Sequence, residues 1–407
     1  MTTGRRCFKL RDTQASKPKA PKKNKRGWRI FRICLIVLAL LLVLILVAAL
    51  LFPKQVNLDR VVRFFRYMGL RDKESYGTVT FDAGASNCYG SFDGGLLVAG
   101  EGGLILYDME AERKCTLQTG LTTPVLSTGE EIAVCYSPGG TYLGLIGSGG
   151  KVLADKNLSG ALTDAEVSPD GYLCYLTEES GYKSVATVLN KNQEPMYVLY
   201  SRSSYLNACA VCEKGRLLAV ATLGEKRSVF RSGVTILRTD TPISDLDTEE
   251  SGVVRADLGN RVVYDLQFLD KEHLCAVCQD EICILDTEGS ILETLSLDGQ
   301  TLLDYAVSDK GFLVLALEKN GRGTRKVTVL DEAGKTLAEL EPEDRLLSVS
   351  AAGKYVAVLT GSDLQIYDKE LDRYFRTTEL HGAQRVLARD DGTALLIGVN
   401  SAKLYIP

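Results

Sequence analysis

The sequence KGFLVLALEKNGRGTRKVTVLD, residues Lys310–Asp331, decides the fold, because its pattern returns along most of the chain. It opens with a turn at Gly311, continues with a short apolar strand and a variable polar hairpin, and closes with a second apolar strand. Short apolar runs bounded by turn residues are typical of β-strands. An eighth repeat, DDGTALLIGVNSAKLYIP, ends the chain, and the other six are Asp93–Asp108, Pro138–Asp155, Pro169–Asn190, Lys214–Arg238, Lys271–Asp286 and Ala352–Asp368.

Another short strand precedes several of these turns, so each repeat holds about four strands in about 40 residues, the length of a propeller blade. Eight repeats over residues 76–407 predict an all-β fold, a β-propeller of eight blades. Seven blades are the alternative if two repeats are irregular. One interval is longer than the others, and its extra polar residues, TPISDLDTEESG at 241–252, predict an insertion loop.

The two ends of the repeat region are expected to close the ring. The last repeat lacks an outer strand, since the chain stops just after the strand between Lys403 and Ile406. The stretch GTVTFD, from Gly77 to Asp82, has the β-branched residues of a strand but belongs to no complete repeat. Pairing these two stretches would leave no open edge to associate with other molecules.

A different feature precedes the repeats. The stretch ICLIVLALLLVLILVAALLF, from Ile33 to Phe52, has twenty residues without a charge, a glycine or a proline. As a helix it would be about 30 Å long, which matches the hydrocarbon core of a bilayer. The sequence therefore predicts a transmembrane helix over residues 33–52, with Trp28 at the inner interface. A cleaved signal peptide is the alternative, but its apolar core would be shorter and followed by a small-residue cleavage site.

Charge gives the expected orientation. Residues 1–32 contain 12 Lys or Arg and one acid, and we expect this basic tail to be disordered and cytoplasmic. Residues 53–75 include NLDRVVRFFRYMGLR, which predicts an amphipathic helix that lies on the lipid surface or packs as a stalk on the next domain. Residues 76–407 would then be an extracellular domain, held at the cell membrane by a single span.

Two repeat ends carry a family resemblance. In ILDTEGSIL at Ile284–Leu292 and VLDEAGKTL at Val329–Leu337, an Asp follows an aliphatic strand and a Gly comes three residues later. These ends resemble the PQQ-like, or quinoprotein-type, propeller repeat. The order of anchor, amphipathic helix and propeller is similar to that of uncharacterised membrane proteins from anaerobic Gram-positive bacteria. The resemblance implies a fold and a membrane location.

The same family pattern is incomplete here. Quinoproteins dock their blades with a Trp in each repeat, and residues 76–407 contain no Trp, so we do not expect a PQQ cofactor. The WD40 repeat is marked by a Trp-Asp pair, and because no such pair occurs the sequence argues against that class.

Two CxxC motifs, Cys209–Cys212 and Cys275–Cys278, have the spacing of a metal or redox pair. The repeats place both within strands, where residues i and i+3 point to opposite faces, so one pair cannot hold a metal ion with both sulfurs. We expect the cysteines of the outer domain to be buried thiols that pack as small apolar residues. An occasional disulfide between two of them is the alternative. The chain has only two histidines, and we expect no catalytic, metal or cofactor site.

These features predict a membrane-tethered propeller that binds a protein partner, or acts as a scaffold, at the cell envelope. Membrane lipid is the partner of the anchor. Residues 76–407 contain 30 basic and 48 acidic residues, a net charge of −18, which argues against nucleic acid as a partner. A glycan or small ligand in the central channel is the alternative. An enzyme would need His, Asp and Glu clustered on one rim, which the sequence does not show.

Overall fold

The computed structural model describes residues 32–33, 35–37, 40, 43, 58–68, 77–226, 228–247, 252–321 and 323–407. The chain divides into two compact units, residues 1–65 and 66–407. Trp28, Phe52 and most of the predicted transmembrane segment lie outside the described residues, whereas Ile33 is helical and exposed. Among the residues that the structure describes, no helix is long and apolar enough to cross a membrane.

Helix α2 (Leu58–Arg66) lies inside the segment for which the sequence predicts an amphipathic helix. Val62 and Phe65, two of its apolar residues, are exposed. The second unit begins at the last residue of this helix. There, Arg66 makes an ion pair of 2.9 Å with Asp391, and the Tyr67 hydroxyl donates to the same carboxylate at 2.7 Å.

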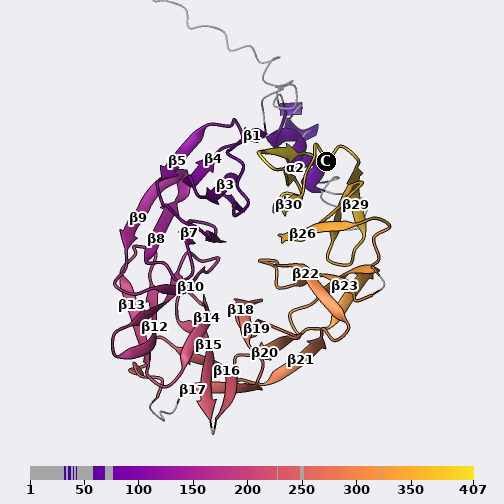
Figure 1. Cartoon of the computed structure of the whole chain (residues 1–407). Coiled ribbons are helices and arrows are strands. Elements are labelled where there is room, and N and C mark those ends of the chain that lie inside the picture. The colour runs from indigo at the N-terminus through magenta and orange to yellow at the C-terminus, as the bar shows by residue number, and fades with distance from the viewer. Residues whose placement is uncertain are drawn as a thin grey trace, which may run out of the picture. The chain divides into compact units, whose positions relative to one another are not determined.

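The second unit is an all-β propeller of eight antiparallel four-stranded sheets arranged in a ring (Figure 1). This confirms the eight-blade prediction and excludes seven. In each blade the first strand lies nearest the centre. Blades 1 to 4 consist of β2 (Cys88–Phe92), β3 (Gly95–Gly100), β4 (Gly103–Tyr107) and β5 (Arg113–Leu117); β6 (Val125–Thr128), β7 (Ile132–Tyr136), β8 (Tyr142–Gly147) and β9 (Lys151–Asn157); β10 (Leu162–Val167), β11 (Leu173–Glu179), β12 (Tyr182–Leu189) and β13 (Pro195–Ser201); and β14 (Tyr205–Cys212), β15 (Leu217–Lys226), β16 (Val229–Arg238) and β17 (Val253–Gly259).

The other four blades continue around the ring in chain order. A short 3-10 turn, η1 (Ser148–Gly150), separates β8 from β9 in blade 2. Blades 5 to 8 consist of β18 (Val263–Phe268), β19 (His273–Cys278), β20 (Glu281–Asp286) and β21 (Ile291–Ser296); β22 (Gln300–Val307), β23 (Leu313–Lys319), β24 (Arg325–Leu330) and β25 (Thr336–Leu340); β26 (Leu346–Ala352), β27 (Tyr355–Thr360), β28 (Leu364–Asp368) and β29 (Arg373–Thr377); and β30 (Arg385–Ala388), β31 (Ala394–Ile397), β32 (Ser401–Tyr405) and β1 (Thr78–Thr80).

Blade 8 combines the two ends of the propeller. Its outer strand β1 pairs antiparallel with β32, with Thr78 opposite Lys403 and Thr80 opposite Ser401. The Gly77 carbonyl accepts a further bond from the Leu404 amide at 2.6 Å, while Asp82 and Ile406 lie just beyond the paired residues. The edge of β32 is therefore covered by a strand that comes more than 300 residues earlier.

The core consists of eight separate clusters of buried apolar residues, one between each pair of neighbouring blades. The central strands of each sheet are therefore buried on both faces, and they read as unbroken apolar runs rather than as alternating patterns. In β3, for example, all six residues of GLLVAG are buried. Burial on both faces explains why short apolar runs were the strongest signal in the sequence.

In several blades an Asp or Asn at the end of the third strand, or just after it, caps the following turn. The Oδ1 atom of Asp331 accepts bonds from the amides of Ala333 and Lys335 at 3.1 and 2.8 Å. Asp286 does the same in blade 5, and Asp108, Asn190 and Asp368 do so in blades 1, 3 and 7. This capping is the physical basis of the Asp and Gly spacing that the sequence shows at these strand ends.

Candidate functional site

The innermost strands line the centre of the ring, and their polar side chains join one blade to the next. Asp164 on β10 accepts bonds from the Tyr136 hydroxyl of blade 2 and from the Cys209 amide of blade 4, both at 2.8 Å. Asp265 on β18 accepts a bond of 2.8 Å from the Tyr305 hydroxyl of blade 6. These carboxylates are engaged in holding the blades together.

Burial dominates the electrostatics at these positions. It raises the pKa of Asp164 and Asp265 above their ordinary values, although the hydrogen bonds from Tyr136 and Tyr305 oppose the shift. Burial also raises the pKa of Glu166, and the nearby Asp265 and Asp164 raise it further. No group of three or more His, Cys, Asp or Glu side chains within the described ranges could hold a metal ion.

The CxxC motifs behave as the sequence predicts. Cys209 belongs to the core cluster between blades 3 and 4, whereas Cys212 packs against the cluster between blades 4 and 5. Cys275 and Cys278 are likewise divided between the clusters on the two sides of blade 5. Opposite strand faces therefore separate the thiols of each motif, and seven of the nine described cysteines are buried.

Blade 4 departs from the regular repeat in two ways. Its strands β15 and β16 have ten residues each, more than any other strand of the described chain. The predicted insertion between β16 and β17 runs along the outer strand of blade 3, where Asp245 forms a parallel bridge with Tyr200. The Tyr200 amide donates to the Ser244 carbonyl, and the Tyr200 carbonyl accepts a bond from the Leu246 amide, both at 2.8 Å.

The lengthened hairpin of β15 and β16 and the insertion enclose a cleft between blades 3 and 4, with a volume of about 540 Å³. Alternation along the strands places Thr222, Arg231, Thr235, Arg255 and Asp257 on one face of blade 4, and this face forms the floor. The walls come from two connections, Ser203–Ser204 before β14 and Leu246–Asp247 of the insertion. No motif in the sequence predicts this cleft.

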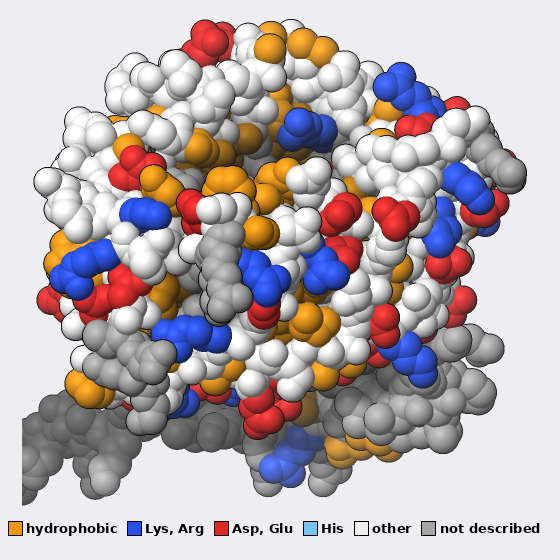
Figure 2. Space-filling model, turned by 60° about the horizontal axis from the view of Figure 1, so that its bottom comes forward, with side chains coloured by type: hydrophobic (Ala, Val, Ile, Leu, Met, Phe, Trp, Pro, Cys, Tyr) orange, Lys and Arg blue, Asp and Glu red, His pale blue; other side chains and the backbone are white. Residues whose placement is uncertain are grey.

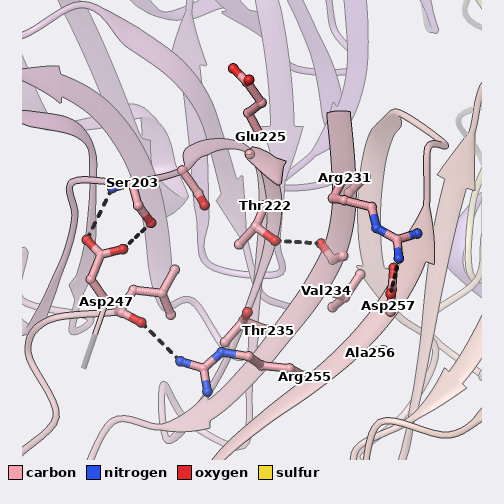
Figure 3. Close-up of a pocket in the computed structure, with 15 residues that line it drawn as sticks. Ser203, Thr222, Glu225, Arg231, Val234, Thr235, Asp247, Arg255, Ala256 and Asp257 are labelled. Atoms are coloured by element: carbon pink, nitrogen blue, oxygen red, sulfur yellow. Dashed lines mark hydrogen bonds and ion pairs between the residues drawn. The ribbon is translucent and has the colours of Figure 1, made fainter. Parts of the chain in front are cut away.

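Figure 3 shows how the polar groups lie in the cleft. On one side, Arg231 makes a long ion pair of 3.6 Å with Asp257. On the floor, Arg255 donates to the Leu246 carbonyl at 3.0 Å. On the opposite wall, Asp247 accepts bonds from the side chain and amide of Ser203. The cleft thus presents two guanidinium groups and two carboxylates around a shared space.

The Asp247 carboxylate is fixed by its surroundings. Partial burial raises its pKa, but the bonds from the Ser203 side chain and from the amides of Arg202 and Ser203 have the larger combined effect, so the pKa lies below the ordinary value. Asp247 therefore stays ionised across the physiological range. Its bonds to Ser203 also join the insertion to the start of blade 4.

Beside the cleft, the tip of the β15–β16 hairpin exposes two apolar side chains. Val229 is 56% and Phe230 is 68% exposed, and Phe230 is among the most exposed large apolar residues of the propeller. In blade 8 the equivalent hairpin, between β31 and β32, carries Val399 at its tip, which is 58% exposed. Blade 4 therefore combines an extended apolar tip with a neighbouring polar cleft.

Comparison with solved structures agrees with this fold. The C-terminal WD40 domain of Sif2 matches with a TM-score of 0.54 at 12% identity, over 81% of this chain and 97% of that domain. Apo AztD from Citrobacter koseri matches with a TM-score of 0.43 at 12% identity, over 81% and 90%. Hsv2p of Kluyveromyces lactis matches with a TM-score of 0.42 at 11% identity, over 74% and 98%.

The match to Sif2 shows a WD40-like fold without the WD40 sequence repeat. The sequence argues against the WD40 class because it has no Trp-Asp pair, yet the chain shares the WD40 type of fold. Clusters of buried apolar side chains fill the space between neighbouring blades here. At 12% identity the likeness concerns the fold alone.

Comparison with sequence families gives the classification. No curated protein matches the chain. The family described as a family of unknown function (DUF5711) matches residues 69–401, which include almost the whole propeller. The protein therefore belongs to the DUF5711 family.

Proposed function

We propose that the chain is a membrane-tethered, extracytoplasmic β-propeller that binds a protein partner at the cell envelope, as an interaction or scaffold module. The anchor over residues 33–52 and the basic tail before it support the tether and its orientation. The propeller fold, which commonly serves protein interaction, supports the binding role. The proposal includes no catalytic step and no cofactor.

The observation that carries the binding role is the hairpin tip of blade 4. Exposing Phe230 in water costs free energy that a partner would recover by covering the ring, and aromatic and Arg side chains are enriched at the energetic centres of interfaces. The tip sequence GEKRSVFR at 224–231 has three basic residues and one acid, within a domain of net charge −18. Its charge therefore suits an acidic protein surface.

The central channel is less suited to the binding role. Its carboxylates Asp164 and Asp265 already bond to neighbouring blades. The extra strand length and the insertion, by contrast, are both concentrated on blade 4. The features that distinguish one blade from the others therefore lie away from the axis of the ring.

Site-specific photocrosslinking in intact cells tests this proposal. A photoreactive amino acid placed at Phe230 should give one dominant adduct with a protein of the cell envelope. The same amino acid at Val399 is the matched control, since Val399 occupies the equivalent hairpin of blade 8 with similar exposure. The proposal predicts no such adduct from Val399. Equal yields from both positions, or no adduct from Phe230, would contradict it.

A further inference from the structure

The chemistry of the cleft points to a ligand of its own. We infer that the cleft between blades 3 and 4 binds an uncharged, hydroxyl-rich ligand, namely a segment of a neutral oligosaccharide. This site adjoins the hairpin tip and includes Gly224 and Arg231 of the tip sequence but not Phe230, and the inference does not rest on the proposed protein partner. The volume of about 540 Å³ lies within the range of roughly 300–1,000 Å³ that small-ligand pockets occupy.

The balance of charge favours a neutral ligand. Arg231 and Asp257 lie together on one side of the cleft, and Asp247 lies on the opposite wall (Figure 3). Arg255 lies on the floor, and Glu225 points away from both arginines. An anionic polymer would meet the two carboxylates, and a cationic segment would meet the two guanidinium groups. Figure 2 likewise shows basic and acidic side chains mixed with apolar ones on the face turned forward, rather than a large patch of one sign.

The hydrogen-bonding groups are those that sugars use. The bond from Arg255 to the Leu246 carbonyl occupies one of the five N–H donors of its guanidinium group. The Asp257 side chain is 65% exposed; its Oδ1 atom accepts a bond of 2.8 Å from the Gly259 amide, and its Oδ2 atom makes the long ion pair with Arg231. Because a carboxylate has about four lone-pair sites, both oxygens can still accept bonds from hydroxyls. Donors and acceptors that alternate around one space suit a ligand whose hydroxyls both donate and accept.

The lining is less suited to a peptide. The apolar residues that line the cleft are Val234, Leu246 and Ala256, all of them buried, and the lining contains no aromatic side chain. A peptide gains most of its binding energy from side chains that fill apolar pockets, which this lining does not offer.

Gly224 keeps the cleft open on the side of the hairpin. A Cβ atom at this position would lie 2.8 Å from the Ser204 Oγ atom, on the opposite wall. The backbone of Gly224 is in an ordinary conformation, so a larger residue there would narrow the cleft without straining the backbone. This position therefore allows the cleft to be filled without removing any polar group.

The test is to probe full-length protein in detergent micelles with a printed array of neutral, sulfated and uronic-acid oligosaccharides, followed by titration of the strongest neutral binder. The inference predicts that neutral oligosaccharides bind, and that Asp257→Asn, Arg255→Met and Gly224→Val each weaken binding about tenfold or more. Val399→Ser, on the equivalent hairpin of blade 8, serves as the control and should leave the affinity within about twofold. Arg255 and Asp257 are exposed and Gly224 is half-buried, and the melting temperature of each variant reports whether the fold is kept.

Three results would overturn the inference. The first is that no neutral oligosaccharide binds at millimolar concentration. The second is that only sulfated or uronic-acid oligosaccharides bind. The third is that a peptide from a random library binds and loses its affinity in Asp257→Asn and Arg255→Met, which would assign the cleft to a polypeptide. None of these results affects the crosslinking at Phe230, so failure of this inference can be told apart from failure of the proposed function.

Discussion

At the scale of single residues, the capped turns show how one conformation is repeated with different side chains. Three residues after each capping Asx, the backbone has a positive φ: 87° at Gly289, 85° at Gly334, 64° at Ala111, 67° at Gln193 and 59° at Leu371. Glycine adopts this conformation freely, whereas other residues pay a conformational cost. The turn geometry is therefore set by the capping Asx, and glycine only lowers its cost.

This difference gives a matched pair of substitutions. In Gly334→Ala the new Cβ would lie 2.6 Å from the Glu293 Cβ, and the alanine would also be held at a positive φ. We therefore expect the free energy of unfolding to fall by about 1–3 kcal/mol. In Ala111→Gly, at an exposed turn, we expect a change of at most about 1 kcal/mol, in the stabilising direction. Thermal unfolding measures both. Equal melting temperatures for the two variants would show that these turns carry no such strain.

Glu166 gives a prediction about pH. Burial and the neighbouring Asp265 and Asp164 raise its pKa, so the folded state favours the protonated carboxyl. Its contribution to stability is complete below the ordinary pKa of a glutamate, about 4.3, and is lost as the pH rises through the raised value. Glu166→Gln should therefore raise the melting temperature at pH 7, and this gain should shrink towards pH 4.

The exposed Glu110 provides the control, since Glu110→Gln should change the melting temperature little at either pH. A gain from Glu166→Gln that is the same at pH 4 and pH 7 would mean that ionisation of this carboxyl does not limit stability.

Burial of the thiols in the CxxC motifs could be predicted from the sequence because it follows from strand alternation. The bonds of Asp164 could not, because they join residues 28 and 45 positions apart.

At the scale of elements, the strand β1 closes the ring with few residues. Val79 and Phe81 are buried in the core cluster between blades 8 and 1, together with Leu404 of β32. A chain that begins at Tyr76 keeps these contacts, and one that begins at Ala85 loses them along with the ladder of β1. Burying two such side chains contributes roughly 3–6 kcal/mol, so we expect the shorter chain to aggregate or to melt at a much lower temperature. If both chains melt at the same temperature, β1 is not needed for closure.

The elements of blade 4 mark the limit of prediction from sequence. The polar stretch at 241–252 was predicted as an insertion, because it interrupts the spacing of the repeats. Its pairing with Tyr200 was not predicted, since a strand of blade 3 and a loop of blade 4 meet only in the folded chain. The cleft could not be predicted for the same reason: its walls and floor come from residues 203–204, 222, 224–225, 231–235, 246–247 and 255–257, none of which carries a motif.

At the scale of the whole molecule, the eightfold arrangement could be predicted because each blade repeats a local pattern of strands and turns. The position of a binding site could not be predicted, because it depends on where one blade differs from the others in three dimensions.

Orientation at the membrane is the remaining prediction at this scale. A protease added to protoplasts should remove residues 76–407 and spare the basic tail, because 12 basic residues before a membrane span would favour the cytoplasmic side. Digestion of the tail with the propeller protected would reverse the orientation.

The central claim is that blade 4, rather than the channel, is where the protein meets its ligands. Amide hydrogen exchange tests this claim most directly when the protein in native membranes, the proposed location of its partner, is compared with the purified full-length protein. We predict slower exchange in the membranes at β15, β16, β17 and the connection at Ser203–Ser204, with no change in the inner strands β10, β18 and β22. Protection of those inner strands, without protection of blade 4, would contradict the claim and would place binding in the central channel.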